Sequence, residues 1–319
     1  MRRTIITTLY IVLTGFIANA QKNYVYAFAN ARNEHEQFIL DIENSIPQPK
    51  ETGLPVKTVS LSNGVKLEYI EQGDPKGTPV VFLHGITDSY HSYDLVLPHL
   101  PSSLHVFSIT QRGHGNSDKP QSGYKLSDFA TDIALFLDKA NIKKAVIVGH
   151  SMGSVITQQF AVKYPEYVMG IVLVSTFASF NDKPDMVEFQ KAIHQLTDPI
   201  DPAFAKEFQQ STLKKEVPAD FFETSVQESL KVPARIWISI MDELMTTNLT
   251  SQLTKVEKPA LIFWGDQDLY CPIADQKKLL AVIPGSVLIT YTGIGHAVHW
   301  EAPERFATDL KGFINKIKK

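Results

Sequence analysis

The sequence has little cysteine: Cys271 is the only one among 319 residues. A single cysteine cannot form a disulfide within the chain. Clustered metal-ligand spacings and a glycine-rich phosphate loop are also missing, so we expect neither a metal nor an organic cofactor. We interpret Cys271 as a small packed side chain beside Pro272 rather than as a reactive thiol.

An excess of charge of one sign is missing too. The 31 Lys and Arg residues nearly balance 34 Asp and Glu residues, which gives a formal net charge of -3 at pH 7. A nucleic-acid partner requires a basic patch that displaces counterions, so we expect none. Apolar residues make up 44% of the chain and are spread along it, as in a folded globular protein.

No apolar run reaches the roughly 20 residues that a membrane-spanning helix needs. The run from Ile5 to Ala18 follows two arginines, contains three threonines and ends in Ala18-Asn19-Ala20. This three-part pattern predicts a secretory signal over residues 1–20 that is cleaved near Ala20. The mature chain is then secreted or periplasmic, without stable membrane insertion; the alternative is an N-terminal anchor.

Residues 21–55 are expected to form an N-terminal arm, with a possible helix over Tyr24–Ile46 followed by prolines. Alternating apolar residues on either side of Asn63-Gly64 then predict a hairpin with a tight turn.

Short, unbroken apolar runs follow, which indicate strands buried on both faces of a parallel sheet. Amphipathic helical segments alternate with them, so we expect an α/β fold with a doubly wound, mostly parallel sheet. Ser127 is placed to cap the first of these helices, and Pro303 to begin the last. The apolar runs are Val80–Leu83, Val106–Ile109, Ala145–Val148, Ile171–Val174, Leu261–Trp264 and Val287–Tyr291.

One interval, from Ser175 to Lys258, contains no strand-like run, only helix-like stretches separated by prolines. Loops this long without structure are uncommon in compact domains. We therefore predict a helical cap over 176–258, inserted before the penultimate strand of a core that spans 56–175 and 259–319.

Gly149-His150-Ser151-Met152-Gly153 matches G-x-S-x-G, between the predicted strand Ala145–Val148 and a helix from about Met152 to Tyr164. A sharp turn at this place exposes the serine hydroxyl, and flanking glycines prevent backbone clashes. Ser151 is therefore the candidate nucleophile. We expect the turn to direct His150 away, as a packed residue.

A serine hydroxyl needs a base to remove its proton, and the base needs an acid to orient it. His296 follows the last predicted strand in a glycine-flanked loop and is the candidate base, with His299 as its competitor. Asp268 is the candidate acid, and Asp266 is the alternative; either could instead be a turn-forming residue.

Negative charge that develops on a carbonyl oxygen requires waiting donors. We assign these to two backbone N–H groups, that of Met152 after the nucleophile and that of Ile86 after the strand Val80–Leu83.

With these motifs in place, the chain resembles the α/β-hydrolase fold family, in its capped serine-hydrolase branch. The resemblance runs from about the Asn63 hairpin to the C-terminal helix and implies a mainly structural role for Arg112–Ser117. The segments that carry it are Leu83-His84-Gly85, Gln111–Ser117, Gly149–Gly153, Gly265-x-x-Asp268-x-x-x-Pro272 and Gly295–Pro303.

Two departures narrow the branch. Dehalogenases and epoxide hydrolases of this family carry an aspartate where Ser151 stands, and carbon–carbon bond hydrolases carry more glycine after His84-Gly85. Carboxylesterases, enol-lactonases and perhydrolases remain, and the resemblance leaves open whether hydrolysis or perhydrolysis is preferred, because a fold does not fix a substrate.

We therefore expect a serine hydrolase that cleaves a small-molecule carboxylic ester or lactone through an acyl-enzyme. Large apolar side chains in the cap indicate an apolar acyl group, about a third of them touching it. They are Phe180, Met186, Phe189, Phe204, Phe208, Phe221, Phe222, Trp237, Met241 and Met245.

Two alternatives stay open. One is a ligand-binding or sensing α/β-hydrolase with slow or vestigial turnover. The other is an aminopeptidase, which needs cap carboxylates to hold the substrate amine. The candidates are Glu188, Glu207, Glu223, Glu228, Asp242 and Glu243.

Overall fold

The computed structural model describes residues 53–180 and 183–318. The predicted signal over 1–20, its cleavage near Ala20 and nearly all of the arm over 21–55 lie outside the described residues. Among the residues described, no helix is both long and apolar enough to cross a membrane.

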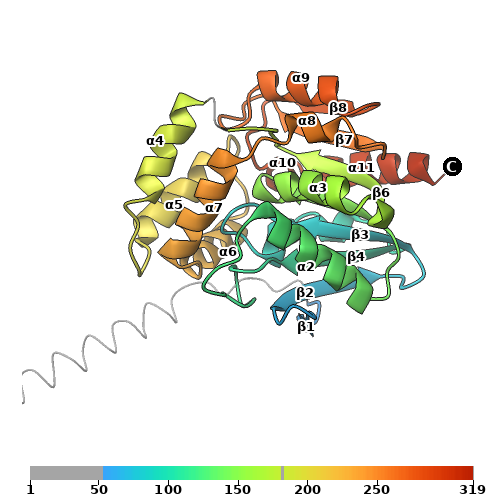
Figure 1. The fold of residues 1–319 in the computed structure, drawn as a ribbon, viewed down its shortest axis with the longest axis horizontal. Coiled ribbons are helices and arrows are strands. Elements are labelled where there is room, and N and C mark those ends of the chain that lie inside the picture. Colours follow the sequence, from blue (N-terminus) through green and yellow to red (C-terminus); the bar gives the residue numbers. More distant parts are fainter. Residues whose placement is uncertain (1–52, 181–182, 319) are drawn as a thin grey trace, which may run out of the picture. The chain divides into compact units, whose positions relative to one another are not determined.

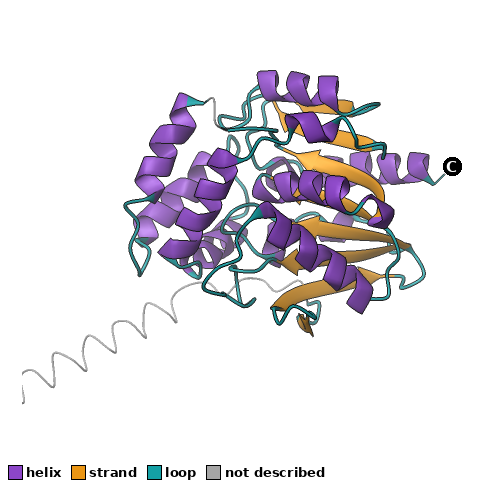
Figure 2. Cartoon of the chain, viewed as in Figure 1, coloured by secondary structure: helices purple, strands orange, loops and turns teal. Residues whose placement is uncertain are grey.

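The core is an eight-stranded sheet in the order β1-β2-β4-β3-β5-β6-β7-β8 (Figure 2). All neighbours from β4 to β8 pair in parallel, whereas β1 and β2 are antiparallel. Each predicted apolar run lies within one of these strands, so the predicted fold class is confirmed. The strands are β1 Lys57–Ser60, β2 Lys66–Gly73, β3 Thr78–Leu83, β4 Leu104–Thr110, β5 Ala145–His150, β6 Val168–Val174, β7 Ala260–Gly265 and β8 Val287–Tyr291.

Helices cover both faces of this sheet (Figure 1). Along β3, Val81 and Leu83 pack into the apolar cluster that contains α2 (Leu126–Lys139) and α3 (Met152–Lys163). Val80 and Phe82 point to the opposite cluster, which contains α11 (Pro303–Ile317). Successive side chains of a strand point to opposite faces, so burial on both sides explains why the apolar runs are unbroken.

The hairpin between β1 and β2 turns more widely than an Asn-Gly pair alone would require. Leu61 N–H donates to Val65 O at 2.8 Å and Gly64 N–H to Leu61 O at 3.1 Å, which leaves a three-residue loop. Only Gly64, at φ +85°, has a positive φ there. This is the three-residue loop that ends in a left-handed glycine.

The predicted cap of α2 is wrong. Lys125 occupies the N-cap position, and its N–H donates to the carboxylate of Asp128 at 3.0 Å. Ser127 lies inside the helix, where its carbonyl accepts from Thr131. The acidic residue at the third helical position thus accepts a hydrogen bond from the N-cap N–H group, and no capping hydroxyl is needed. Pro303 begins α11, as predicted.

Between β6 and β7 the chain forms helices, four of which gather at one end of the strands (Figure 1). We call these four the cap. Pro184 and Pro202 stand in the first turns of α4 and α5, where a missing N–H costs nothing. The cap helices are α4 Pro184–Ile193, α5 Pro202–Ser211, α6 Ala219–Leu230 and α7 Ala234–Thr246; α8 Thr250–Leu253 and α9 Ile273–Val282 flank β7, and α10 Val298–Glu301 precedes α11.

Candidate active site

Ser151 stands in a strained turn between β5 and α3, with φ 50° and ψ -115°. The flanking glycines are sterically required. A methyl group on Gly149 would lie 2.1 Å from Gly153 O, and one on Gly153 would lie 2.3 Å from Leu83 O. Strain of this kind is maintained where the surroundings hold the turn, and it presents the serine side chain at the end of the sheet.

The structure pairs His296 with Asp268. Nδ1 of the imidazole lies 2.9 Å from Oδ2 and 3.0 Å from Oδ1 of the carboxylate, and both residues are buried. Oδ1 also accepts hydrogen bonds from the N–H groups of Tyr270 and Cys271 at 2.8 and 3.0 Å. A carboxylate fixed in this way holds the proton on Nδ1, so Nε2 is left to act as the base.

The two competing residues have other partners. The Asp266 carboxylate accepts from Gly293 N–H at 2.7 Å and so stabilises the loop after β8. His299 is fully buried, and its Nε2 lies 3.0 Å from the Ser92 hydroxyl. Geometry therefore favours Asp268 over Asp266 and His296 over His299.

A cap residue that sequence reasoning missed positions the loop of His296. The carbonyl of Thr212, just after α5, accepts from His296 N–H at 2.9 Å and from Ala297 N–H at 3.2 Å. On the core side, the Ser175 hydroxyl donates to His296 O at 2.5 Å. The acceptor is a backbone carbonyl at the end of α5, far from His296 in the sequence, so no local sequence pattern could identify it.

Ser151 and His296 line one pocket. Among the described residues, the Ser151 hydroxyl has no hydrogen-bond partner. Contacts between a nucleophile and its base are often long without substrate and shorten in the reacting complex. His150 is packed as predicted, but its ring also borders this pocket rather than turning away from it.

The assigned donors, the N–H groups of Ile86 and Met152, form no hydrogen bond within the described part of the chain, and Ile86 lines the pocket. Met152 is the first residue of α3, whose initial N–H groups have no partner inside the helix. Thr87 holds the loop after Ile86 at φ 71°, and its hydroxyl lies 2.9 Å from that of Ser229 in α6. Two unpaired N–H groups beside a nucleophile can stabilise an oxyanion.

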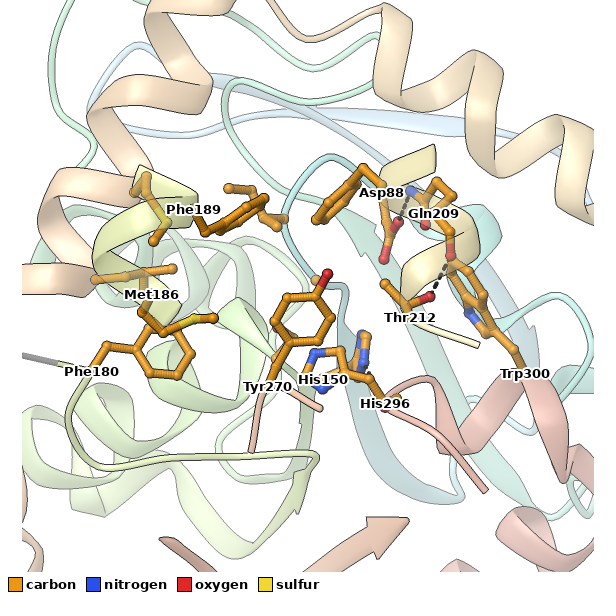
Figure 3. Close-up of a pocket in the computed structure, with 16 residues that line it drawn as sticks. Asp88, His150, Phe180, Met186, Phe189, Gln209, Thr212, Tyr270, His296 and Trp300 are labelled. Carbon is orange, nitrogen blue, oxygen red and sulfur yellow. Dashed lines mark hydrogen bonds between the residues drawn. The ribbon is translucent and has the colours of Figure 1, made fainter. Parts of the chain in front are cut away.

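The pocket lies between the sheet and the cap (Figure 3). Five of the ten predicted apolar cap residues line it. Others, such as Phe204 and Trp237, pack on each other with ring centroids 5.8 Å apart. The apolar lining from the cap and the segment just before it is Phe180, Met186, Phe189, Phe208, Met241 and Leu244.

A carboxyl group that sequence reasoning missed also lines the pocket. Asp88, two residues after Ile86, is 4% exposed, and burial raises its pKa to about 7. None of the six predicted cap carboxylates is among the lining residues. The sequence shows only that Asp88 follows an expected donor, and its place in the pocket depends on the packing of α5 against it.

Three donor atoms, from Asp268, Cys271 and His296, lie within 4.8 Å of one another. The hydrogen bond between Asp268 and His296 already occupies two of these groups. Burial raises the pKa of the Cys271 thiol well above its usual value, as for a packed, unreactive side chain. The arrangement suits an acid–base pair better than a metal, and Cys271 is packed as interpreted from the sequence.

Arg112 has the structural role that the resemblance implies. Its guanidinium donates to both carboxylate oxygens of Asp132 in α2, at 2.5 and 2.6 Å, and to Gly123 O at 2.9 Å. These contacts tie the loop after β4 to α2, and Arg112 does not line the pocket.

Comparison with known proteins gives matches over most of the chain. The family Hydrolase_4, described as serine aminopeptidase, S33, matches residues 73–304. Lipase 3 of Moraxella sp. (strain TA144) is 25% identical over 294 residues, 83% of this chain and 86% of that protein.

Solved structures share the fold. The esterase EaEST from Exiguobacterium antarcticum superposes with a TM-score of 0.73 at 22% identity, covering 82% of this chain and 99% of that one. The enol-lactonase from Burkholderia xenovorans LB400 gives 0.72 at 18% identity, with 81% and 100% covered.

Proposed function

Because the chain belongs to the α/β-hydrolase family described as serine aminopeptidase, S33, we propose that it is a serine hydrolase that cleaves a carboxylic ester or lactone through an acyl-enzyme. The observation that carries this proposal is the pairing of His296 with Asp268 in the pocket that Ser151 lines. The names of Lipase 3, EaEST and the enol-lactonase support ester or lactone bonds as the target.

In the first step, Ser151 Oγ attacks the carbonyl carbon while Nε2 of His296 takes the hydroxyl proton. The N–H groups of Ile86 and Met152 hold the resulting oxyanion. When the tetrahedral intermediate collapses, the C–O bond to the leaving alcohol breaks, and His296 returns the proton to that oxygen. Asp268 stays ionised and stabilises the imidazolium.

In the second step, water enters and His296 removes one of its protons. The hydroxide adds to the acyl carbon, and the bond to Ser151 Oγ breaks as this oxygen regains the proton. The free acid then leaves. Each of these proposed steps uses only side chains and backbone groups of the chain together with water. Hydrogen peroxide in place of water gives a peracid instead, and competition between the two acceptors measures which one the pocket prefers.

Replacement of Ser151 by alanine tests the assignment. We expect Ser151→Ala to abolish turnover of p-nitrophenyl butyrate while circular dichroism and thermal melting remain those of the wild type. Ser239→Ala, on the exposed side of α7, is the matched control and should retain activity. Undiminished turnover by Ser151→Ala would remove the proposal.

Turnover measurements on the wild type separate the proposed esterase from a sensing protein and from an aminopeptidase. A sensing protein would release one equivalent of nitrophenol and then stop, whereas an enzyme continues for many turnovers. An aminopeptidase would prefer aminoacyl-naphthylamides to acyl esters. The apolar lining and the position of all six cap carboxylates outside the lining support the ester reading.

We also propose that residues 1–20 direct secretion or periplasmic export and are removed near Ala20. Expression of the full chain in a bacterial host, followed by fractionation and N-terminal sequencing, tests this. A cytoplasmic product that retains Met1 would contradict it.

A further inference from the structure

The pocket has two ends of different chemistry (Figure 3). Phe180, Met186 and Phe189 lie at one end, and Asp88 and Gln209 lie at the other. His296 lines the same pocket and is labelled below Asp88 in this view. An apolar acyl or alkyl chain of the substrate would fit the end formed by Phe180, Met186 and Phe189. It gives no reason for the carboxyl group of Asp88 at the other end.

Asp88 is held in place by neutral groups only. The Gln209 amide donates to Oδ1 at 3.0 Å, and the Ser92 hydroxyl donates to Oδ2 at 3.3 Å. Within residues 53–180 and 183–318, Asp88 forms no ion pair. The backbone of Gly85 also hydrogen-bonds to this carboxylate. A carboxylate has about four acceptor positions, so these three bonds leave it capacity for a further donor.

One buried polar atom near Asp88 has no hydrogen-bond partner among the described residues. Nδ1 of His150 is buried and makes no hydrogen bond. A methyl group on Gly85 would lie 2.9 Å from this atom and 3.1 Å from Asp88 Oδ2. Gly85 lines the pocket, so the two polar atoms border the same side of the loop that carries the Ile86 donor.

We infer that Asp88 is a specificity-determining residue that accepts a hydrogen bond from a hydroxyl or ammonium group of the substrate. The preferred substrate is then an ester or lactone that carries a hydrogen-bond donor apart from its apolar chain. This inference rests on the proposed function and names the substrate class of the same site.

Burial makes this contact selective. A carboxylate removed from water without a cation is costly, and a donor from the ligand offsets that cost. A plain alkyl ester would cover Asp88 and leave it unsatisfied. A site that hydrogen-bonds a polar group of its substrate strongly rejects an analogue that lacks this group. An apolar pocket discriminates between chain lengths much less strongly. The pKa of about 7 means that the carboxylate form is available near neutral pH.

Matched ester pairs test the inference in a pH-stat assay at pH 8. Methyl butyrate, methyl 3-hydroxybutyrate and methyl 3-aminobutyrate vary the acyl side, and propyl and 2,3-dihydroxypropyl butyrate vary the alcohol side. In the wild type, we expect kcat/KM for at least one donor-bearing ester to exceed that of its plain partner by about tenfold or more. Comparison of the hydroxyl-bearing and amino-bearing esters shows whether Asp88 prefers a hydroxyl or an ammonium group.

Asp88→Asn, which keeps the side-chain volume, should reduce that ratio at least several-fold. Asp88→Ser is a smaller second variant, for use if the first does not fold. Asp242→Asn, a half-exposed cap carboxylate outside the pocket, is the matched control and should keep the wild-type ratio.

Two results would overturn the inference while leaving the proposed function intact. One is a wild type that turns over plain esters through Ser151 without preferring any donor-bearing partner. The other is an Asp88 variant that changes both members of each pair equally. If no ester is turned over by the wild type, the proposed function fails, and this inference fails with it.

Discussion

The Asp268 carboxylate and the His296 imidazole, 28 positions apart in the chain, are joined by contacts of 2.9 and 3.0 Å. Asp268 follows β7 and His296 follows β8, and these strands are parallel neighbours. The carboxyl ends of parallel neighbours lie at the same edge of the sheet, where ligand crevices form. Strand order therefore brings the two loops that carry these side chains to the same edge.

Asp268→Asn should lower kcat for p-nitrophenyl butyrate by about 10⁴-fold with little change in folding. The amide still fits the space but can donate to Nδ1, so the imidazole is held in the wrong tautomer. Asp266→Asn, two residues away, is the matched control and should cost far less activity, because the Asp266 carboxylate bonds to the Gly293 backbone and to the Gln267 side chain and not to His296. Equal losses in both variants would contradict the assignment of Asp268.

The glycine at the end of G-x-S-x-G gives a prediction about stability. Gly153→Ala would place its methyl group 2.3 Å from Leu83 O and 2.6 Å from His84 O, so the loop that carries Ile86 must shift. We expect a lower melting temperature and lost activity. Gly312→Ala in α11 meets nothing within 4 Å and should raise the free energy of unfolding by roughly 0.5–1 kcal/mol. Thermal melts of both variants check the pair; a Gly153→Ala protein as stable as the wild type would argue against the close approach.

Features that depend on nearby residues were predictable from the sequence. The strand Ala145–Val148, the turn at Ser151 and the helix after it follow one another directly, so local pattern and turn chemistry suffice. The choice between Asp266 and Asp268 was not local. It required the path of the loop after β7, which delivers one carboxylate to His296 and the other to Gly293.

Other features arise only from packing. Asp88 reads as an ordinary loop aspartate until α5 brings Gln209 against it. The carbonyl of Thr212 has no side-chain signature at all, although it receives the His296 N–H. The wrong cap at Ser127 shows the same limit at short range, because Asp128 competes for the same helix end.

Buried histidines predict how stability changes with pH. Burial lowers the pKa of His114 to about 4, and it lowers that of His84, His150 and His299 well below the usual value. Unfolded histidines bind protons near pH 6.5, so below that pH the unfolded state binds more protons than the fold. The contribution of these groups is therefore present above pH 6.5 and is lost as pH falls. Asp88, with a raised pKa of about 7, acts in the opposite direction between about pH 4 and 7.

The variant His114→Asn isolates one such group. Between pH 7 and pH 5, it should lose less stability than the wild type by on the order of 2 kcal/mol, since one pKa unit corresponds to about 1.4 kcal/mol. Urea unfolding at pH 5, 6, 7 and 8 measures the slope. His99→Asn, at an exposed position, controls for the substitution itself. A variant whose slope equals that of the wild type would show that His114 protonates equally in both states.

The apolar end of the pocket predicts how chain-length preference can be changed. Phe189 in α4 lines the pocket and lies nearly parallel to Phe208, with ring centroids 5.8 Å apart. Phe189→Ala removes a ring from the lining and opens room for a longer chain. The ratio of kcat/KM for p-nitrophenyl octanoate over butyrate should therefore rise by about tenfold, in line with the 1–3 kcal/mol that an apolar pocket can discriminate.

Phe204→Ala separates this effect from a general loosening of the cap. Phe204 is also half-buried in α5, but it packs edge-on against Trp237 and does not line the pocket. Its removal should lower the melting temperature through the lost packing while leaving the octanoate-to-butyrate ratio close to that of the wild type. If both variants shifted the ratio equally, cap mobility rather than the shape of the lining would set the chain-length preference. Removing a ring that only limits space can improve the fit of a longer chain but cannot worsen it. A lower ratio in Phe189→Ala would therefore show that the long acyl chain binds elsewhere in the pocket.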